Sequence, residues 1–462
     1  MVALLAALGL ARNELLLFAG VGLLLGGLDD LLLDVLYLLR KIWRDLTVYT
    51  RFPRMGARDL PEPGAAGPIA VFVPAWQESA VIGSMLNRCL SLWTKEDMRI
   101  FVGVYPNDPD TIRVVAGVAK GEGSTKIQLV THSRPGPTTK GDCLNQLWLA
   151  LKDWEVEQGR EALAIVLHDA EDVVHADALR LIGLLSPRFA LVQLPVLPLV
   201  SARSRWVSGH YLDEFSEAHA KSLLVREALG AALPSAGVGC AFNRSALGLI
   251  AQARDERPFD PLSLTEDYEL GLRIGEQGGR GILVRMRDAS GELIATREYF
   301  PDTLAAAVRQ KARWMIGIAL AGWDRLGWTG GWREGWMRLR DRRAALAAVI
   351  LAAAYLGLLF SAIVTLIAWF VGAAEPSVPP LLLWLLKLNL VLLGWRLLVR
   401  FGFVWEAYGA MEAFRSIPRA VVGNFIALFA AQRAVFTYVR HLRGAPLGWD
   451  KTAHRFPDEA TE

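Results

Sequence analysis

Ala344–Val371 constrains the fold of this chain more than any other segment, because it contains no charged side chain. A helix needs about 20 predominantly apolar residues to cross a bilayer, and this segment exceeds that length. A second apolar segment, Leu381–Val399, follows a turn that contains Glu375 but no Lys or Arg. The two segments are predicted to cross a membrane outward and back, with Lys387 and Asn389 facing protein or an aqueous path.

The N-terminal part contains a further predicted span, Leu15–Leu39, whereas Met1–Leu10 is apolar but too short to cross alone. The carboxylates of Asp29, Asp30 and Asp34 are costly in lipid, so we expect them near a membrane interface or against another helix. Basic residues follow this span and precede Ala344: Arg40, Lys41, Arg44, Arg51, Arg54, Arg338, Arg340, Arg342 and Arg343. Because Lys and Arg are enriched in cytoplasmic flanks, the region between the spans is predicted to be cytoplasmic.

Pro418–Arg440 is apolar but contains Asn424, Gln432 and Arg433. If this segment crossed the membrane, the basic residues that follow it would lie outside, against the positive-inside tendency. A lipid-exposed Arg433 would also cost roughly 2.5–3.5 kcal/mol. We therefore predict an amphipathic helix lying at the cytoplasmic membrane interface.

Apolar residues concentrate at both ends of the 462-residue chain, which predicts a soluble domain held between membrane segments. The predicted parts are an N-terminal transmembrane helix with its basic flank (1–52), a cytoplasmic domain (53–335), transmembrane and interfacial helices (336–443) and a cytoplasmic tail (444–462). The net charge of +3 argues against nucleic-acid binding. Cys89, Cys143 and Cys240 form no CxxC pair, which favours reduced cytoplasmic thiols over a disulfide framework or zinc site.

The middle of the chain alternates short apolar runs with helical patterns. Strands are predicted at 69–73, 100–105, 126–131, 163–167, 190–195 and 281–286, and helices at 81–92, 143–154, 207–229 and 302–320. Residues 234–242 are expected to form a loop and a short strand. This alternation predicts an α/β domain with a Rossmann-like, mostly parallel sheet.

The segment 163–172, LAIVLHDAED, runs from an apolar strand into Asp169, Glu171 and Asp172. Ligands of open α/β sheets bind beyond the carboxyl ends of the strands, so these acids are placed where a ligand would lie. Crowded carboxylates need a cation or protons, and oxygen ligands suit Mg²⁺ or Mn²⁺ carried with a phosphate substrate. The alternative is a solvated turn with spare acids.

Further polar residues are expected near this edge of the sheet: Glu78, Asp108, Asp142 and Asp267 at strand ends or helix starts, and Gln310, Arg313, Trp314 and Gly317 on one face of a helix. Sugar transfer from a nucleotide diphosphate to a hydroxyl uses such parts together. A metal neutralises the pyrophosphate leaving group, and a carboxylate takes the acceptor proton. An arginine offsets phosphate charge, and an aromatic ring supports the sugar.

These residues resemble the family 2 glycosyltransferases, in the membrane-embedded branch that includes cellulose, chitin and hyaluronan synthases. Within it, the chain is most similar to the bacteriophage adsorption protein B group. The resemblance covers nearly the whole chain through PAWQESAVIG, PGPTTKGDCLN, LHDAEDVVH, SAGVGCAF, LTEDYELGLR, TREYFP, VRQKARWMIGIALAGW and WDKTAHRFP. It implies a GT-A-like fold, a divalent metal and a UDP-sugar donor.

Position by position, the family pattern implies roles for the donor side. Glu78 and Asp108 would hold the uracil and ribose, and Lys140 and Asp142 of TKGD match a (K/R)xD-type nucleotide-contact motif. Asp169 and Glu171 occupy the DxD positions that coordinate the metal and diphosphate. Most members have Asp where this chain has Glu171, so Asp172 could share or take over the metal.

The pattern also implies roles at the reaction centre. Asp267 of TED would be the general base, with Glu266 beside it in the catalytic motif. Gln310, Arg313 and Trp314 match QxxRW, which holds the diphosphate and floors the acceptor site.

Structural roles compete with several of these assignments. Ser263 and Glu266 could form only a helix capping box, and Asp267 only an N-terminal helix charge. Arg313 and Trp314 could form a buried cation–π pair. Lys140 could be a solvated loop charge, Asp108 a turn former, and His168 and His175 structural residues.

The sequence and the resemblance together predict an inverting glycosyltransferase of the bacterial inner membrane. It would extend an exopolysaccharide from a UDP-sugar, with N-acetylhexosamine the preferred donor, and an export or regulatory protein could be its partner. The alternatives are transfer of a single sugar to a lipid carrier, a non-enzymatic scaffold or phage-entry component, and a glycoside hydrolase that uses two carboxylates.

Overall fold

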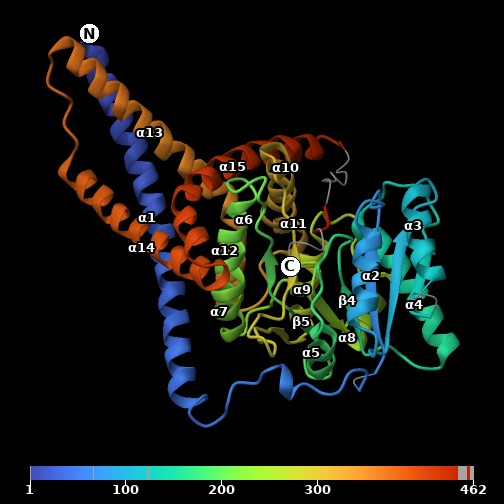
Figure 1. The fold of residues 1–462 in the computed structure, drawn as a ribbon. Helices are drawn as coiled ribbons and strands as arrows, with labels where there is room; N and C mark the ends of the chain where they lie inside the picture. The colour runs from blue at the N-terminus through green and yellow to red at the C-terminus, as the bar shows by residue number, and fades with distance from the viewer. Residues whose placement is uncertain (1, 66, 122, 124, 446–454, 458–462) are drawn as a thin grey trace.

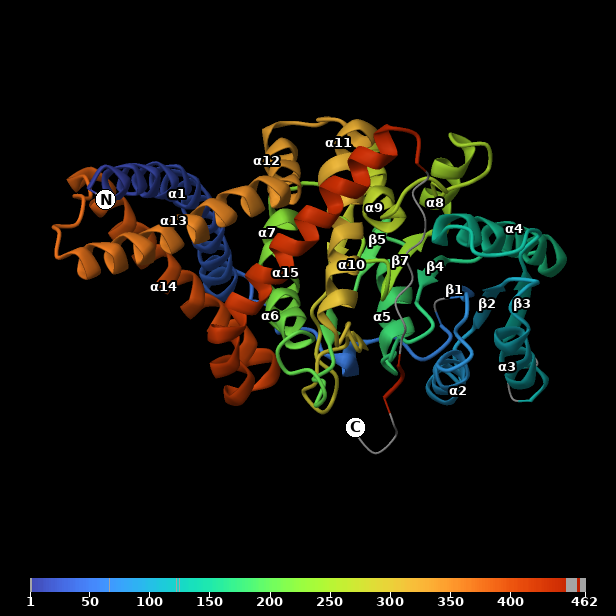
Figure 2. The same cartoon turned by 90° about the horizontal axis from the view of Figure 1, so that it is seen from above.

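The computed structural model describes residues 2–65, 67–121, 123, 125–445 and 455–457. Most of the WDKTAHRFP stretch and of the predicted tail 444–462 lies outside the described residues. The chain forms an α/β domain and a helical arm in which the N-terminal helix lies beside two helices from the C-terminal part of the chain (Figure 1). Helix α1 lies alongside α13 and α14 in the arm, away from the sheet (Figure 2).

The main sheet has seven strands in the order β3-β2-β1-β4-β7-β5-β8 among the described residues. The strands are β1 Ile69–Pro74, β2 Met98–Val104, β3 Ile127–Thr131, β4 Ala164–Leu167, β5 Leu191–Gln193, β7 Cys240–Asn243 and β8 Gly281–Leu283. Of these described strands, only β7 runs antiparallel to its neighbours, β4 and β5. The predicted α/β class with a mostly parallel sheet is therefore confirmed.

Helices cover both faces of this sheet. Alternate residues of β1 face opposite ways, so Val71 and Val73 pack with α2 (Ile82–Leu92), α3 (Pro109–Lys120) and α5 (Ala178–Leu185). Ala70 and Phe72 pack with α4 (Lys140–Gln158), α8 (Arg244–Gln252) and α9 (Glu266–Glu276). Strands buried on both faces explain the continuous apolar runs in the sequence.

The predicted strand 190–195 contains β5, and a strand that was not predicted follows it directly and belongs to the second sheet. After β5 the chain enters β6 (Val196–Pro198), which pairs in parallel with β9 (Thr296–Glu298). Pro195 separates the two strands and has no backbone N–H to donate, so it interrupts the first ladder, while its carbonyl accepts from Thr296 N at 3.0 Å. The second sheet brings residues 296–300 to the same edge as β4.

Two predicted helices begin or continue differently in the structure. Helix α4 begins at Lys140, because Thr139 caps it by accepting from Asp142 N at 3.2 Å. Lys140 and Asp142 thus lie in a first helical turn, and the predicted start at Cys143 is late. The segment 302–320 divides into α10 (Leu304–Met315) and a π-helical turn, η3 (Ile316–Leu320).

The remaining described helices connect the α/β domain to the arm: η1 Ala57–Asp59, α6 Gly209–Glu217, η2 Ala218–Ser222, α7 Leu223–Ala228, α11 Ala321–Leu326 and α12 Trp332–Arg342. The arm consists of α1 (Val2–Thr47), α13 (Ala344–Val371) and α14 (Pro380–Tyr408). Helix α1 is continuous, so the described residues of the apolar segment 1–10 belong to it and do not form a separate segment. With a rise of 1.5 Å per residue, its length of about 69 Å is more than twice the hydrocarbon thickness of a bilayer.

The three aspartates of α1 face other helices, one of the two predicted environments. Asp29 and Asp30 both pair with Arg340 and Arg343, and Asp30 also pairs with Arg396 of α14. Asp34 accepts from Lys221 Nζ at 2.5 Å. These ion pairs join α1 to the end of α12, to α14 and to η2.

Helix α15 (Ala410–Leu442) crosses the α/β domain and packs on α10 and α6 (Figures 1 and 2). Its buried face is formed largely by small residues such as Ala413 and Ala430, and its opposite face exposes Phe425 and Phe436. In the described part of the chain, α1, α13, α14 and α15 are each long and apolar enough to cross a membrane. The interfacial position of α15 stays a prediction, and the different composition of its buried and exposed faces supports it.

Candidate active site

A cavity opens at the carboxyl ends of β1 and β4, where the sequence places its acids. Its polar lining comprises Glu78, Thr139, Lys140, Asp169, Glu171, Ser263, Thr265, Glu266, Asp267, Glu298, Gln310 and Arg313. Its apolar wall includes Val196, Phe215, Val238, Phe300 and Trp314. Residues from both sheets, α4, α9 and α10 therefore meet in one place.

The loop after β4 presents Asp169 and Glu171 to the cavity. Asp169 Oδ1 lies 2.5 Å from Lys140 Nζ. Asp172 is fully buried and outside the lining, and its carboxylate accepts from His168 Nδ1 at 2.6 Å and from Asp169 N at 3.1 Å. Asp172 thus holds the loop in shape, His168 is structural, and Glu171 is the better placed of the two acids to meet a ligand.

Glu266 and Asp267 occupy the first turn of α9. The N-cap residue is Thr265, which makes no side-chain capping bond, so the capping box from Ser263 to Glu266 is not formed. Burial raises the pKa of Glu266 to about 7, and repulsion from Asp267 adds to the shift. Burial also raises the pKa of Asp267, although the nearby Lys140 lowers it. A carboxylate with a raised pKa is suited to general-base work.

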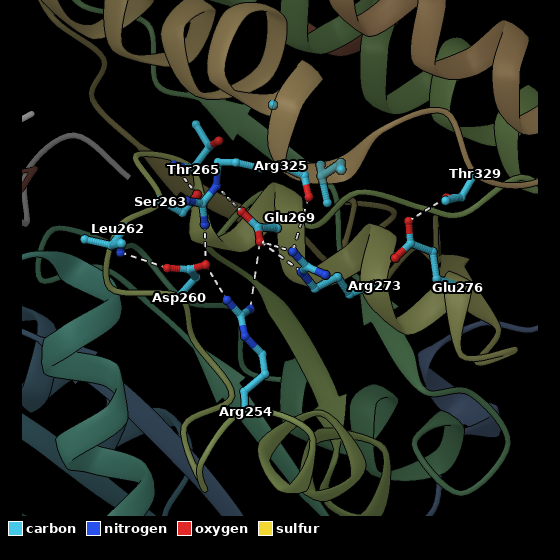
Figure 3. A network of polar contacts seen from close by, with 12 residues as sticks. Arg254, Asp260, Leu262, Ser263, Thr265, Glu269, Arg273, Glu276, Arg325 and Thr329 are labelled. Carbon is cyan, nitrogen blue, oxygen red and sulfur yellow. Dashed lines mark hydrogen bonds and ion pairs between the residues drawn. The ribbon is translucent and has the colours of Figure 1, made fainter. Parts of the chain in front are cut away.

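A polar network fixes the loop that leads into α9 (Figure 3). Arg325 of α11 bonds to both Asp260 and Glu269, and Arg254 also pairs with both carboxylates. Arg273 adds a bond to Glu269 at 2.8 Å. Except for the cavity-lining residues of that loop, the residues of this network lie outside the cavity. Their contacts fix the loop and the first turns of α9, and so the positions of Glu266 and Asp267.

Gly237 lies against Asp267 and was not predicted as a site residue. Its φ is +77°, and a Cβ at this position would lie 2.2 Å from Asp267 Oδ2. Only glycine fits a left-handed backbone this close to a carboxylate. The glycines of PSAGVGC indicated an unusual backbone in this segment, but the sequence did not show that Gly237 contacts Asp267.

Helix α10 presents Gln310, Arg313 and Trp314 to the cavity. Three buried polar atoms have no hydrogen-bond partner in the described part of the chain: Gln310 Oε1, Arg313 Nε and Thr265 Oγ1. Buried polar atoms are nearly always bonded, so three unpartnered atoms around one cavity point to a ligand. The absence of a side chain at Gly317 lets η3 approach Thr265 closely. A Cβ at Gly317 would lie 2.4 Å from Thr265 Oγ1.

Trp314 belongs to an aromatic cluster. Its ring centroid lies 6.1 Å from that of Tyr211 and 6.4 Å from that of Phe215. Cation–π contacts within the described residues do not include the pair Arg313 and Trp314, so that alternative is wrong. Phe215 and Phe300 line the cavity and were not predicted, because nothing in their local sequence distinguishes them from core residues.

Two predicted site residues lie outside the lining. Asp108 caps α3, accepting from Thr111 N at 3.4 Å, and also accepts from Gln77 N at 2.6 Å. Asp142 accepts from His132 Nε2 at 3.1 Å and from Arg134 Nη2 at 2.6 Å. Both shape the loops beside Glu78, which does line the cavity.

The cavity has more anionic than cationic side chains. Six carboxylates line it (Glu78, Asp169, Glu171, Glu266, Asp267 and Glu298) and two fixed cations (Lys140 and Arg313). Across the described residues, no three His, Cys, Asp or Glu side chains are grouped tightly enough to hold a metal by themselves. A Mg²⁺-like ion needs only one or two protein carboxylates when substrate phosphates supply further oxygens. The residues therefore fit a cation that arrives with a diphosphate.

Comparison with known proteins identifies the family. The family model "Glycosyltransferase like family 2" matches residues 66–317, a range that contains every cavity-lining residue named above. The chain is 38% identical, over 94% of its length, to bacteriophage adsorption protein B of Escherichia coli strain K12. The same values hold for bacteriophage N4 adsorption protein B of Escherichia coli O157:H7. The chain spans about 60% of the length of these relatives.

A solved structure is similar in fold. It is the mannosyltransferase PcManGT from Pyrobaculum calidifontis, in complex with GDP-Man and Mn²⁺, with a TM-score of 0.52 and 14% identity. The similarity covers 94% of this chain and 99% of that one. Together with the family match, it confirms the GT-A-like fold and the enzyme class, and the chain belongs to glycosyltransferase family 2.

Proposed function

We propose that this chain transfers a sugar, with inversion, from a nucleotide-diphosphate sugar to a hydroxyl of a glycan acceptor. The observation that carries the proposal is the meeting of a partly buried Asp267 with Lys140, Arg313 and two loop carboxylates in one cavity. This arrangement provides a base at one end and charge partners for a diphosphate at the other.

The donor side is assigned to the end that contains Asp169 and Glu171. These carboxylates would hold Mg²⁺ or Mn²⁺, and the ion would neutralise the diphosphate as it leaves. Lys140 and Arg313 offset the remaining phosphate charge, and Gln310 Oε1, which has no partner among the described residues, is available to accept a hydrogen bond from a sugar hydroxyl. Glu78 would bind the nucleoside, while Asp108 and Asp142 act by fixing the surrounding loops.

The acceptor side is assigned to the region between Asp267 and the aromatic wall. Asp267 would remove the proton from the attacking hydroxyl, and burial together with repulsion from Asp169 raises its pKa. One displacement by that hydroxyl inverts the anomeric centre. Trp314, Phe215 and Phe300 offer ring faces and edges on which a sugar can pack.

UDP-N-acetylhexosamine is the donor we assign, and GDP-mannose is the competitor to test because the similar solved structure contains it. The product we assign is an exopolysaccharide. The long apolar helices support attachment to the bacterial inner membrane, and the basic flanks of α1 and α13 favour an active site in the cytoplasm. An export or regulatory partner protein would complete the system.

A donor screen with the purified full chain tests this function. UDP-N-acetylglucosamine, UDP-N-acetylgalactosamine, UDP-glucose and GDP-mannose are each incubated with the chain and Mn²⁺, and both nucleotide release and product size are scored. Asp267→Asn serves as the matched inactive control. A polymer ladder supports exopolysaccharide synthesis, whereas one added sugar on a lipid supports the single-transfer alternative. Absence of nucleotide release with every donor refutes the assigned donors.

Participation in bacteriophage adsorption is a second candidate, favoured by the names of the two curated relatives. Comparing phage adsorption to cells that carry the wild type or Asp267→Asn separates a scaffold from an enzyme. A pure scaffold supports adsorption equally well in both strains.

A further inference from the structure

Lys140 occupies an electrostatically unfavourable position in its own helix. It is the first residue of α4, where the helix dipole presents partial positive charge and disfavours a cation. Asp142, two positions later, has the negative charge that this end of a helix favours. Its carboxylate pairs with His132 and Arg134. The position of Lys140 is therefore explained by the cavity and not by the helix.

The ammonium of Lys140 compensates the acids of the cavity. Its Nζ lies 2.5 Å from Asp169 Oδ1, and the two side chains are only 17% and 31% exposed. Attraction between partly buried charges is stronger than between charges in open water, so the ammonium stays beside Asp169 unless another anion attracts it. Asp169 is also one of the two carboxylates assigned to the metal.

A divalent cation and this ammonium compete for the same carboxylate. Mg²⁺ binds oxygen at about 2.0–2.1 Å, so an ion on Asp169 would lie close enough to repel the ammonium strongly. A diphosphate resolves the conflict, because its oxygens accept the lysine while they share the metal. A lysine has a flexible stem and a point charge, which allow that exchange.

The backbone around Lys140 is fixed, so only the side chain can move. A Cβ at Gly141 would lie 2.7 Å from the carbonyl oxygen of Asp260, which shows how tightly the start of α4 packs on the loop before α9. The Thr139 cap fixes the same turn. Exchange of the ammonium between Asp169 and a ligand therefore requires no movement of the helix.

We propose that Lys140 is an internal counter-cation that holds the place of the divalent metal beside Asp169 and yields it only when a nucleoside diphosphate binds. This inference rests on the proposed function. It makes Lys140 a positioning residue that couples metal binding to nucleotide binding. Metal alone would bind weakly, and a nucleoside diphosphate without metal would also bind weakly.

Binding of Mn²⁺ to the purified full chain tests the coupling without any turnover. The free Mn²⁺ signal in electron paramagnetic resonance gives the affinity with and without UDP. In the wild type, UDP should tighten Mn²⁺ binding at least about 10-fold. Lys140→Met keeps most of the length of the side chain but removes the charge, so Mn²⁺ alone should bind about 10-fold more tightly, and UDP should tighten Mn²⁺ binding less than in the wild type.

Lys152→Met is the matched control, because Lys152 lies on the same helix and pairs with Glu256 outside the cavity. It should leave both affinities unchanged. Lys140→Arg retains the charge and should keep Mn²⁺ alone as weak as in the wild type, which provides a second test if Lys140→Met fails to fold. A wild type that binds Mn²⁺ equally with and without UDP, or a folded Lys140→Met with unchanged affinity for Mn²⁺ alone, overturns the inference. Failure of the wild type to bind Mn²⁺ and UDP together would instead count against the proposed function.

Discussion

The Cα of Gly237 faces the carboxylate of Asp267 so closely that a Cβ would lie 2.2 Å from Oδ2. Gly237→Ala should therefore displace the base and reduce kcat by about 100-fold, the scale expected for a misplacement near 1 Å. Gly230→Ala is a matched control, since Gly230 has a similar φ of +74° but no atom within 4 Å of the position that an added methyl group would take. Equal activity of the two variants would show that the contact does not matter.

Asp267→Asn removes proton acceptance but leaves the cavity shape and the acids after β4 in place. Transfer should fall on the order of 100- to 10,000-fold, which is typical for loss of a general base. UDP binding in Mn²⁺, measured by calorimetry, should persist. Turnover at the wild-type rate would remove Asp267 from the mechanism.

The raised pKa of Glu266 predicts a pH-dependent stability. Its folded-state pKa is about 7 against an ordinary value of 4.5, so the folded protein retains a proton that the unfolded chain has lost between these pH values. The free energy of unfolding therefore falls as pH rises from 4.5 through 7. Glu266→Gln should raise Tm more at pH 8 than at pH 5, whereas Glu157→Gln, at an exposed position of α4, should show no such difference.

Chelation tests the assigned metal. EDTA should abolish transfer, and Mn²⁺ or Mg²⁺ should restore it, because the ion would neutralise the diphosphate as it leaves. Asp169→Ala should weaken UDP binding in Mn²⁺ while the fold, followed by circular dichroism, is retained. Transfer that continues in excess EDTA would rule out a readily exchanged metal.

The location of α15 can be tested from the C-terminal end of the chain. Thr461, which lies beyond the described residues, is replaced by Cys in a chain that lacks Cys89, Cys143 and Cys240. If α15 lies at the cytoplasmic interface, this thiol should resist a membrane-impermeant maleimide in intact spheroplasts. Glu375→Cys, in the turn between α13 and α14, should label readily as the positive control.

Patterns within one segment predicted much of this fold. The run 163–167 and its acids identified β4 and the ligand edge, because a buried strand has a recognisable composition. Strand β6, which follows β5 directly, was not predicted, since an apolar run does not reveal where one strand ends and a strand of another sheet begins. Pro195 was the available clue, and its meaning depends on the partner strands.

The cavity was predicted less completely than the fold. Asp267 and Gln310 line the cavity and were singled out by residue type and position, whereas Lys140, which also lines it, was implied only by the resemblance to the family. Asp142 has a similar local sequence signal to Lys140, yet its carboxylate is engaged by His132 and Arg134 in the structure. Which side of a helical turn faces a ligand depends on packing with distant segments, and a single sequence does not contain that information.

The pairing of Asp29 with Arg340 and Arg343 joins two segments that are synthesised far apart in time. These partners are separated by 311 and 314 residues, which at about 5–20 residues per second represents roughly 15–60 s of synthesis. During that interval α1 has been made, but the arginines that neutralise its acids have not. The nascent chain therefore needs a temporary polar environment for these carboxylates, such as the insertion machinery or the headgroup layer, until the end of α12 and then α14 arrive.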